Sequence, residues 1–211
     1  MLTLGILGLG EGRSTMSAAL NSSKVKLKTI CDLNEDLCKQ RSKEFQFFNY
    51  TTKYEDMLND PEIDIIVELI DDADAAFAIL KIALSNGKAI VTANKKMLAE
   101  HLEEIYQLQK EYDRPVLYEG SVCGSIPILR NLEEYYDNDL ISSIEGIFNG
   151  STNYILTEIF DGRKSYAESL RKAQELGFAE SNPDLDVKGF DAKYKLVIAV
   201  AHTFGVFVKP D

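Results

Sequence analysis

Short apolar runs alternate with segments of helical composition five times in the first 118 residues of the chain. This alternation restricts the fold more than any other feature, because a helix between two strands returns the second strand parallel to the first. The clearest strand, Ile63–Ile70, reads IDIIVELI, and its β-branched residues are typical of a strand buried on both faces. The pattern predicts an α/β fold, a Rossmann-like doubly wound parallel sheet with helices on both faces.

The expected elements of this sheet domain can be given by residue. The strands are Leu2–Leu7, Val25–Cys31, Ile63–Ile70, Lys88–Thr92 and Val116–Tyr118, and the helices are Ser14–Leu20, Glu35–Glu44, Tyr54–Leu58, Ala73–Ser85 and His101–Tyr112. Asn86–Gly87 is expected to end the preceding helix, because asparagine and glycine accept the backbone conformation of a helix C-terminus.

The alternation stops after Ser121, and we place a domain boundary near residue 125. The first domain is therefore 1–125, and the second, 126–211, is expected to be an α+β region. Its expected elements are a helix Pro127–Tyr136, a strand Ile141–Phe148, and helices Ser151–Phe160, Tyr166–Leu176 and Ala192–Phe204. Ser151 or Thr152 is expected to cap the first of these last three helices.

Composition excludes several classes of function. The formal net charge is −11, and nucleic-acid binding needs a basic face, so no nucleic-acid partner is expected. No apolar run is long enough to span a membrane, and MLTLGILGLG resembles a first strand more than a signal peptide. The three cysteines, Cys31, Cys38 and Cys123, are not spaced as metal ligands. They fit a reducing compartment, so we expect a cytoplasmic protein.

A glycine-rich turn follows the first expected strand. Gly8, Leu9 and Gly10 lead into a helix, where a close backbone approach and free N–H groups suit a pyrophosphate, although a plain tight turn is the structural alternative. The full dinucleotide fingerprint has glycine where this chain has Arg13. Asp32 ends the second strand, where a carboxylate binds a ribose 2′-hydroxyl and repels a 2′-phosphate. The motif therefore predicts NAD or NADP, with NAD favoured, unless Arg13 offsets the bias or Asp32 is only a turn residue.

Four later segments carry a more specific pattern. They read VTANKK at 91–96, YEGSVCGSIPI at 118–128, GIFNGSTNYILT at 146–157 and AQELGFAESNPDLDVKGFDAKYK at 173–195. In order and spacing they resemble the homoserine dehydrogenases, and the resemblance covers essentially the whole chain, weakest at the first glycine loop. It implies an NAD(P)-dependent enzyme that interconverts L-homoserine and L-aspartate 4-semialdehyde, in the biosynthesis of threonine, methionine and isoleucine.

The resemblance also implies roles for particular residues. Lys195 matches the family's proton donor and acceptor and Lys95 a second active-site lysine, and Thr92 and Lys95 fall on its nucleotide-binding segment. The amino-acid substrate is implied to contact Glu180, Asp186 and Asp191. The two lysines and the acidic residues of the loop around Glu180 have a structural alternative as solvated surface charges, and Asp191 and Lys195, four apart on a helix, could form only a helix salt pair.

The family further implies a monovalent cation, sodium, held mainly by backbone oxygens at Glu119, Val122, Gly124 and Ile126, and a homodimer in the complete protein. Members continue beyond the position that corresponds to residue 211. We therefore expect a truncated chain that folds in large part but shows little activity.

Two other functions remain open at this stage. One is a small-molecule dehydrogenase of the glucose–fructose oxidoreductase type, which usually carries Glu-Lys-Pro where this chain has Ala93-Asn94-Lys95. The other is a fragment without activity that only binds a nucleotide.

Overall fold

The computed structural model describes residues 1–134 and 141–210. The chain divides into two compact units. The first comprises Met1–Met97 and His101–Ser121, and the second comprises Leu98–Glu100 and Val122–Asp211. Each unit is described by itself below.

The first unit is a six-stranded sheet in the order β3-β2-β1-β4-β5-β6, and every pair of neighbouring strands is parallel. The predicted doubly wound parallel sheet is confirmed. Its strands are β1 (Leu2–Leu7), β2 (Val25–Cys31), β3 (Tyr50–Thr51), β4 (Ile65–Glu68), β5 (Ala89–Thr92) and β6 (Val116–Leu117), and its helices are α1 (Gly12–Leu20), α2 (Glu35–Phe45), α3 (Tyr54–Leu58), α4 (Ala73–Ser85) and α5 (Lys95–Tyr112).

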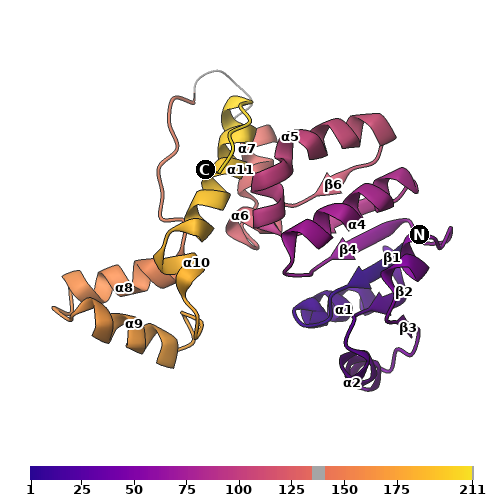
Figure 1. Ribbon diagram of the computed structural model, residues 1–211, viewed down its shortest axis with the longest axis horizontal. Helices are drawn as coiled ribbons and strands as arrows, with labels where there is room; N and C mark the ends of the chain where they lie inside the picture. The colour runs from indigo at the N-terminus through magenta and orange to yellow at the C-terminus, as the bar shows by residue number, and fades with distance from the viewer. Residues whose placement is uncertain (135–140, 211) are drawn as a thin grey trace. The chain divides into compact units, whose positions relative to one another are not determined.

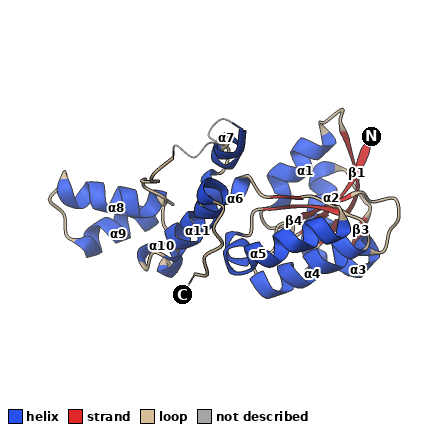
Figure 2. Cartoon of the chain, turned by 90° about the horizontal axis from the view of Figure 1, so that it is seen from above, coloured by secondary structure: helices blue, strands red, loops and turns tan. Residues whose placement is uncertain are grey.

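The chain runs outward from β1 in two opposite directions, first to β2 and β3 and later to β4, β5 and β6. Because parallel crossovers are right-handed, the two directions place their helices on opposite faces of the sheet. Figures 1 and 2 show this arrangement, with α1 on one face and α4 and α5 on the other.

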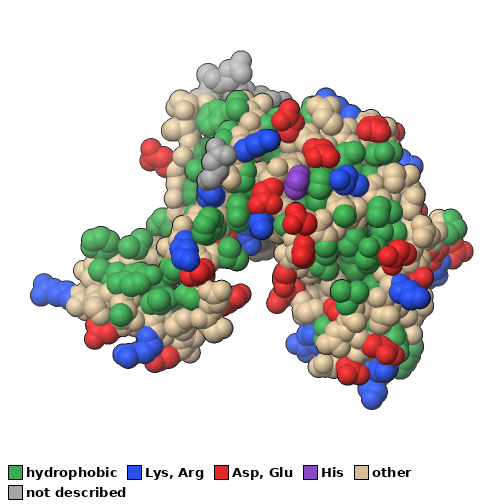
Figure 3. Space-filling model, in the orientation of Figure 1, with side chains coloured by type: hydrophobic (Ala, Val, Ile, Leu, Met, Phe, Trp, Pro, Cys, Tyr) green, Lys and Arg blue, Asp and Glu red, His purple; other side chains and the backbone are tan. Residues whose placement is uncertain are grey.

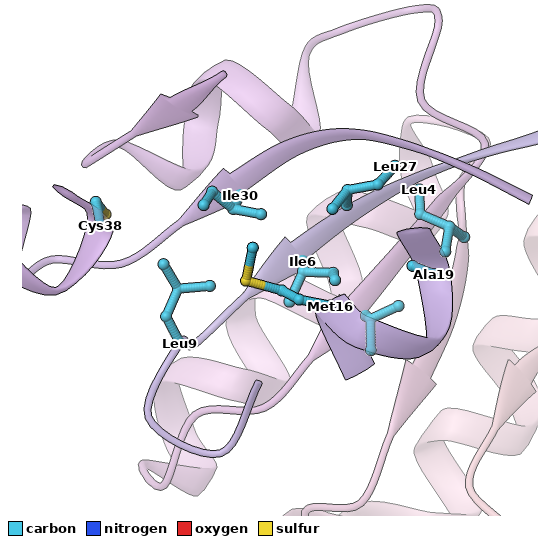
Figure 4. Packing of buried hydrophobic residues seen from close by; sticks show 9 residues of the cluster. Leu4, Ile6, Leu9, Met16, Ala19, Leu27, Ile30 and Cys38 are labelled. Atoms are coloured by element: carbon cyan, nitrogen blue, oxygen red, sulfur yellow. The ribbon is translucent and has the colours of Figure 1, made fainter. Parts of the chain in front are cut away.

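One face of the sheet is closed by a continuous apolar cluster. Ile6 from β1, Ile30 from β2 and Met16 from α1 are completely buried, and Leu9 of the glycine turn packs with them (Figure 4). Burying a side chain of this size contributes roughly 1.5–3 kcal/mol. Because Leu9 belongs to this core, the turn after β1 is anchored to the sheet.

The first unit differs from the prediction at two places. Strand β3 was not predicted, because two residues are too few to produce a hydrophobic pattern. Helix α5 begins at Lys95, six residues before the expected start, because the Asn94 side chain accepts a hydrogen bond from Met97 N at 3.0 Å and caps the helix there. At His101, where the predicted helix starts, the backbone leaves helical geometry and α5 kinks.

The second unit contains the helices α7 (Ile128–Glu134), α8 (Gly150–Phe160), α9 (Tyr166–Glu175), α10 (Asp184–Val187) and α11 (Phe190–Phe204), and α6 (Gly120–Cys123) runs across the boundary between the units. Helices α8 and α9 pack against each other through Ile155 and Ala173, and Ala179 of the loop after α9 belongs to the same apolar cluster. Exposed hydrophobic side chains gather over this helix pair (Figure 3), among them Leu156 and Phe160 of α8.

The predicted strand Ile141–Phe148 is wrong, and the elements described in this region are helices. Residues 141–149 form no strand, and none of residues 122–134 and 141–210 supplies a strand with which they could pair. A β-strand requires such a partner for its N–H and C=O groups. The end of the predicted helix Pro127–Tyr136 lies outside the described residues.

No helix in the described parts of the chain is both long and apolar enough to cross a membrane.

A substitution at Gly8 tests the close contact between the turn after β1 and the segment after β4. Its φ is +91°, and an added Cβ would lie 2.5 Å from the backbone oxygen of Leu69. Gly8→Ala should therefore lower the free energy of unfolding by roughly 1–3 kcal/mol, measured by urea unfolding. The matched control is Gly10→Ala, because a Cβ at Gly10 meets no atom within 4 Å. Equal stability of the two variants would contradict this account of the turn.

Candidate functional site

A single row of paired residues marks the carboxyl ends of five strands. It runs Thr51, Cys31, Leu7, Glu68 and Thr92 across β3, β2, β1, β4 and β5. The segments that follow these residues therefore meet at one edge of the sheet. In open parallel sheets, ligands bind outside this edge at the point where the strand order reverses, which here lies between β1 and β4.

The turn after β1 contains the predicted cofactor residues Gly8, Leu9 and Gly10. Gly8 takes a backbone conformation that favours glycine, and the space around Gly10 is open. Helix α1 begins at Gly12, with no acidic residue in its first turn and no side-chain cap from Glu11. The first N–H groups of α1 are therefore not capped by a side chain, an arrangement that suits a pyrophosphate.

Asp32 follows β2, beside the glycine turn. One carboxylate oxygen accepts a hydrogen bond from Leu9 N at 2.8 Å, and the other accepts one from Asn34 N at 2.9 Å. Asp32 is thus both the turn residue and a fixed carboxylate next to the glycine loop, so the two interpretations of this residue are compatible.

Two arginines lie around the same turn and share one carboxylate. Arg41 donates to Leu9 O at 3.1 Å and to Glu44 at 2.8 Å, and Arg13 forms an ion pair with Glu44. The hydrogen bond from Arg13, with a further one from Arg41, lowers the pKa of Glu44, although partial burial opposes this shift. Arg41 could not be identified from the sequence, because residues of α2 reach the turn only through the fold.

The segment after β5 contains Thr92 and Lys95. The Thr92 hydroxyl donates to the Glu68 carboxylate at 2.6 Å and accepts from Asn94 N at 3.0 Å. Because Asn94 caps α5, Lys95 is the first residue of that helix, at the carboxyl edge of the sheet. Glu68 was also missed, although a carboxylate at the end of an apolar strand is a signal that the sequence contains.

In the second unit, Lys195 is held by two oxygens. Its ammonium group donates to Asp191 Oδ2 at 2.6 Å and to the backbone oxygen of Phe148 at 2.9 Å. Asp191 is 8% exposed. The prediction that Asp191 and Lys195 share a face of one helix is confirmed, and this pair is largely shielded from water.

Asn149 connects this pair to a second carboxylate. Its Nδ2 group donates to Asp186 at 2.7 Å and to Asp191 at 3.0 Å, while its Oδ1 accepts from Thr152 N at 2.8 Å and so caps α8. The expected cap, Ser151 or Thr152, is therefore wrong, because the asparagine lies at the position from which a side chain reaches the first free N–H groups. We call Asn149, Asp186, Asp191 and Lys195 the Lys195 cluster. It carries two carboxylates and one ammonium group.

Glu180 is placed differently from the other predicted substrate residues. Its side chain is exposed in the loop after α9, and its backbone oxygen accepts from Gln174 at 3.0 Å. Among the described residues, no hydrogen bond joins its carboxylate to the Lys195 cluster.

The residues predicted to bind a cation lie on both sides of the unit boundary. Glu119 belongs to the first unit, and Val122, Gly124 and Ile126 belong to the second. Gly124 has a φ of +59° with open space around it, and Ile126 is exposed. The described residues contain no group of three or more His, Cys, Asp or Glu side chains that could hold a metal ion.

Comparisons with known proteins give consistent results. Residues 8–119 match the family model for the NAD-binding domain of homoserine dehydrogenase, and residues 127–211 match the homoserine dehydrogenase model. The homoserine dehydrogenase of Helicobacter pylori is 37% identical over 99% of this chain and 50% of the relative. The chain spans about half the length of the curated relatives it matches.

Solved structures show the same similarity. A homoserine dehydrogenase from Thiobacillus denitrificans superposes with a TM-score of 0.89 at 33% identity, over 99% of this chain and 50% of that one. A hyperthermophilic archaeal homoserine dehydrogenase in complex with NADPH superposes with a TM-score of 0.80 at 25% identity, over 97% of this chain and 70% of that one.

The Lys195 cluster predicts a charge-dependent effect at Asn149. Asn149→Asp keeps the oxygen that caps α8 but replaces two N–H donors with a charge beside Asp186 and Asp191. We expect Asn149→Asp to lower the free energy of unfolding by roughly 1–3 kcal/mol at neutral pH. The neighbouring carboxylates raise the pKa of the new carboxyl, so the loss should grow as pH rises and shrink on acidification.

Thermal unfolding between pH 5 and pH 8 measures this effect. The matched control is Asn182→Asp, because the exposed Asn182 side chain also accepts a backbone hydrogen bond, from Asp184 N. A loss for Asn149→Asp that equals the control's, or that does not change with pH, would contradict the described cluster.

Proposed function

The chain belongs to the homoserine dehydrogenase family, and on that premise we propose that it supplies the nucleotide site and the substrate site of an NAD(P)-dependent enzyme. The proposed reaction interconverts L-homoserine and L-aspartate 4-semialdehyde. The observation that carries the proposal is the Lys195 cluster, a shielded lysine held by a carboxylate and a backbone oxygen. We assign the nucleotide to residues 1–125 and the amino-acid substrate to residues 126–211.

The nucleotide site fits a dinucleotide. The open space at Gly10 allows close backbone approach, and the uncapped N-terminus of α1 suits the pyrophosphate. Each Asp32 oxygen accepts one backbone hydrogen bond and keeps a lone pair for a ribose hydroxyl. Thr92 and Lys95 are proposed to contact the nicotinamide side, because β5 lies in the half of the sheet opposite Asp32.

A nicotinamide cofactor held at the Gly8–Gly10 turn, Asp32, Thr92 and Lys95 would supply the hydride chemistry at the substrate carbon in both directions. The protein moves one proton at the substrate oxygen. When homoserine is oxidised, neutral Lys195 takes the hydroxyl proton as the carbonyl forms, and when the aldehyde is reduced, the Lys195 ammonium returns that proton to the oxygen. Asp191 orients Lys195 through the 2.6 Å bond. Lys95, at the start of α5, is proposed as the second active-site lysine.

Charge supports an amino acid as substrate. The Lys195 cluster has one more negative than positive group, which suits the ammonium group of homoserine. Asp186 and Asp191 are proposed to bind the substrate inside the cluster, and Glu180, which is exposed, is proposed to approach the substrate from its loop.

A monovalent cation, sodium, is proposed at Glu119, Val122, Gly124 and Ile126. Hard cations take backbone oxygens as ligands, and the left-handed turn at Gly124 leaves open space around its Cα. The support for this part of the proposal is the resemblance of the segment together with this local geometry.

The cofactor preference yields a first test. Asp32 opposes a 2′-phosphate, and both Arg13 and Arg41 already pair with Glu44. We expect NAD to bind at least about tenfold more tightly than NADP, equivalent to about 1.4 kcal/mol, measured by calorimetry on the 211-residue chain. Asp32→Asn should narrow the difference by removing the charge. Tighter binding of NADP by the unsubstituted chain would refute the preference.

The role of Lys195 yields a second test. In a catalytically active form of the protein, Lys195→Ala should lower kcat by roughly 10²–10⁴-fold, because the proton transfer is lost, with little change in nucleotide affinity. Lys188→Ala, which removes an exposed lysine paired with Asp184, is the control. Near-normal kcat for Lys195→Ala in a homoserine-dependent assay of NAD reduction would exclude the assigned role.

A further inference from the structure

Glu68 is a buried carboxyl that the proposed mechanism does not use. It ends β4 and is 1% exposed, between Leu7 of β1 and Thr92 of β5 in the row of paired residues. Within residues 1–134 and 141–210, no cation forms an ion pair with it. Burying a charge without a counterion costs free energy. The two hydrogen bonds to Glu68 are therefore the interactions that offset its desolvation.

Those partners belong to a closed ring of four hydrogen bonds. Glu68 accepts from Ile70 N at 2.7 Å and from the Thr92 hydroxyl at 2.6 Å. Asn94 closes the ring, because its backbone N–H donates to Thr92 Oγ1 at 3.0 Å and its side chain donates to Ile70 O at 3.1 Å. We call Glu68, Ile70, Thr92 and Asn94 the Glu68 ring. It ties the segment after β4 to the segment after β5.

The Glu68 ring also fixes the start of α5. The same Asn94 side chain that donates to Ile70 O accepts from Met97 N at 3.0 Å. The position of Lys95, the first residue of the helix, therefore depends on the ring.

The ring lies at the edge where the cofactor is expected. The strand order reverses between β1 and β4, and Leu69 O approaches Gly8 closely enough to exclude a Cβ there. A dinucleotide crosses such a sheet with one mononucleotide on each half. Asp32 follows β2 in one half, so the segments joined by the ring lie in the half that receives the nicotinamide.

We propose that Glu68 is a positioning residue for the nicotinamide half of the cofactor, holding the segments after β4 and β5 in the arrangement that receives it. This inference rests on the proposed nucleotide site. The ring requires the carboxylate form, because each Glu68 oxygen already faces a donor. A glutamine has the same shape but would point N–H groups at one of these donors.

Burial makes the charged form of Glu68 unfavourable for the stability of the fold, so a role in positioning can be distinguished from a role in stabilising the protein. Burial raises the pKa of Glu68, the hydrogen bonds from Thr92 and Ile70 oppose that shift, and Asp71, the charged group that acts on it, adds to it. A carboxyl with a raised pKa stabilises the fold fully below its ordinary value of 4.5, and that contribution is lost as pH rises through the folded-state pKa. The stability of Glu68→Gln relative to the unsubstituted chain should therefore improve as pH rises from about 4.5 to neutrality.

The test compares two nucleotides by calorimetry on the 211-residue chain. NADH occupies both halves of the site, whereas ADP occupies only the half that includes Asp32. Glu68→Gln should bind NADH roughly tenfold more weakly, the effect of one disrupted hydrogen-bonded contact, and should bind ADP as before. Asn94→Asp, which keeps the oxygen that caps α5 but removes the donor to Ile70 O, should show the same selective loss of NADH affinity, and it serves as the second variant if Glu68→Gln does not fold.

Asp64→Asn is the matched control, because Asp64 also accepts a backbone hydrogen bond, from Thr3 N at 2.7 Å, but at the opposite end of the sheet. It should leave the ratio of NADH to ADP affinity unchanged. An equal loss of NADH and ADP affinity in the Glu68 and Asn94 variants, or no loss of affinity for either nucleotide, would overturn the inference. If the unsubstituted chain binds neither nucleotide, the proposed function fails, and this inference fails with it.

Discussion

Parallel pairing of β1 with both β2 and β4 is the constraint on which the nucleotide site depends. It aligns Cys31, Leu7 and Glu68 in one row, so the next residues of three separate segments emerge at the same edge. Each segment is then held by a different contact. After β1, Gly8 lies against the backbone oxygen of Leu69, and after β2, the Asp32 carboxylate accepts a hydrogen bond from the glycine turn. The Glu68 ring holds the segments after β4 and β5. A shift of one strand would separate these groups, because none of them is held by local contacts alone.

In the second unit, a lysine and two carboxylates lie close together, and the Asp191–Lys195 pair is largely shielded from solvent. Asn149 makes this possible because its amide donates to both carboxylates while its oxygen caps α8. One side chain thus connects the start of a helix, a short helix and the lysine-bearing helix α11. The Lys195 ammonium is held by one acceptor on α11 and by the backbone oxygen of Phe148 in the preceding loop, and the proposed proton transfer would start from this fixed position.

The sequence predicted the features that depend on local pattern. The apolar run of β1, the β-branched run of β4, the glycine turn and the Asp191–Lys195 pair follow from composition and spacing. Features that depend on tertiary contacts could not be predicted from the sequence. Residues 141–149 have strand-like composition but no strand to pair with in the described part of their unit, and the arginine at position 41 reaches the glycine turn only because α2 folds back beside it. The Glu68 ring joins residues 24 apart, and hydrogen bonds over that separation leave no periodic signal.

The central claim is that one unit binds the nicotinamide nucleotide and the other binds the amino-acid substrate. Amide hydrogen exchange on the 211-residue chain, with NADH, with homoserine and with both, tests it directly. The account predicts that NADH slows exchange at residues 8–12 and 92–97, and that homoserine slows exchange at residues 148–152 and 186–195. Protection by NADH confined to the second unit, or no protection by either ligand in the named segments, would contradict it.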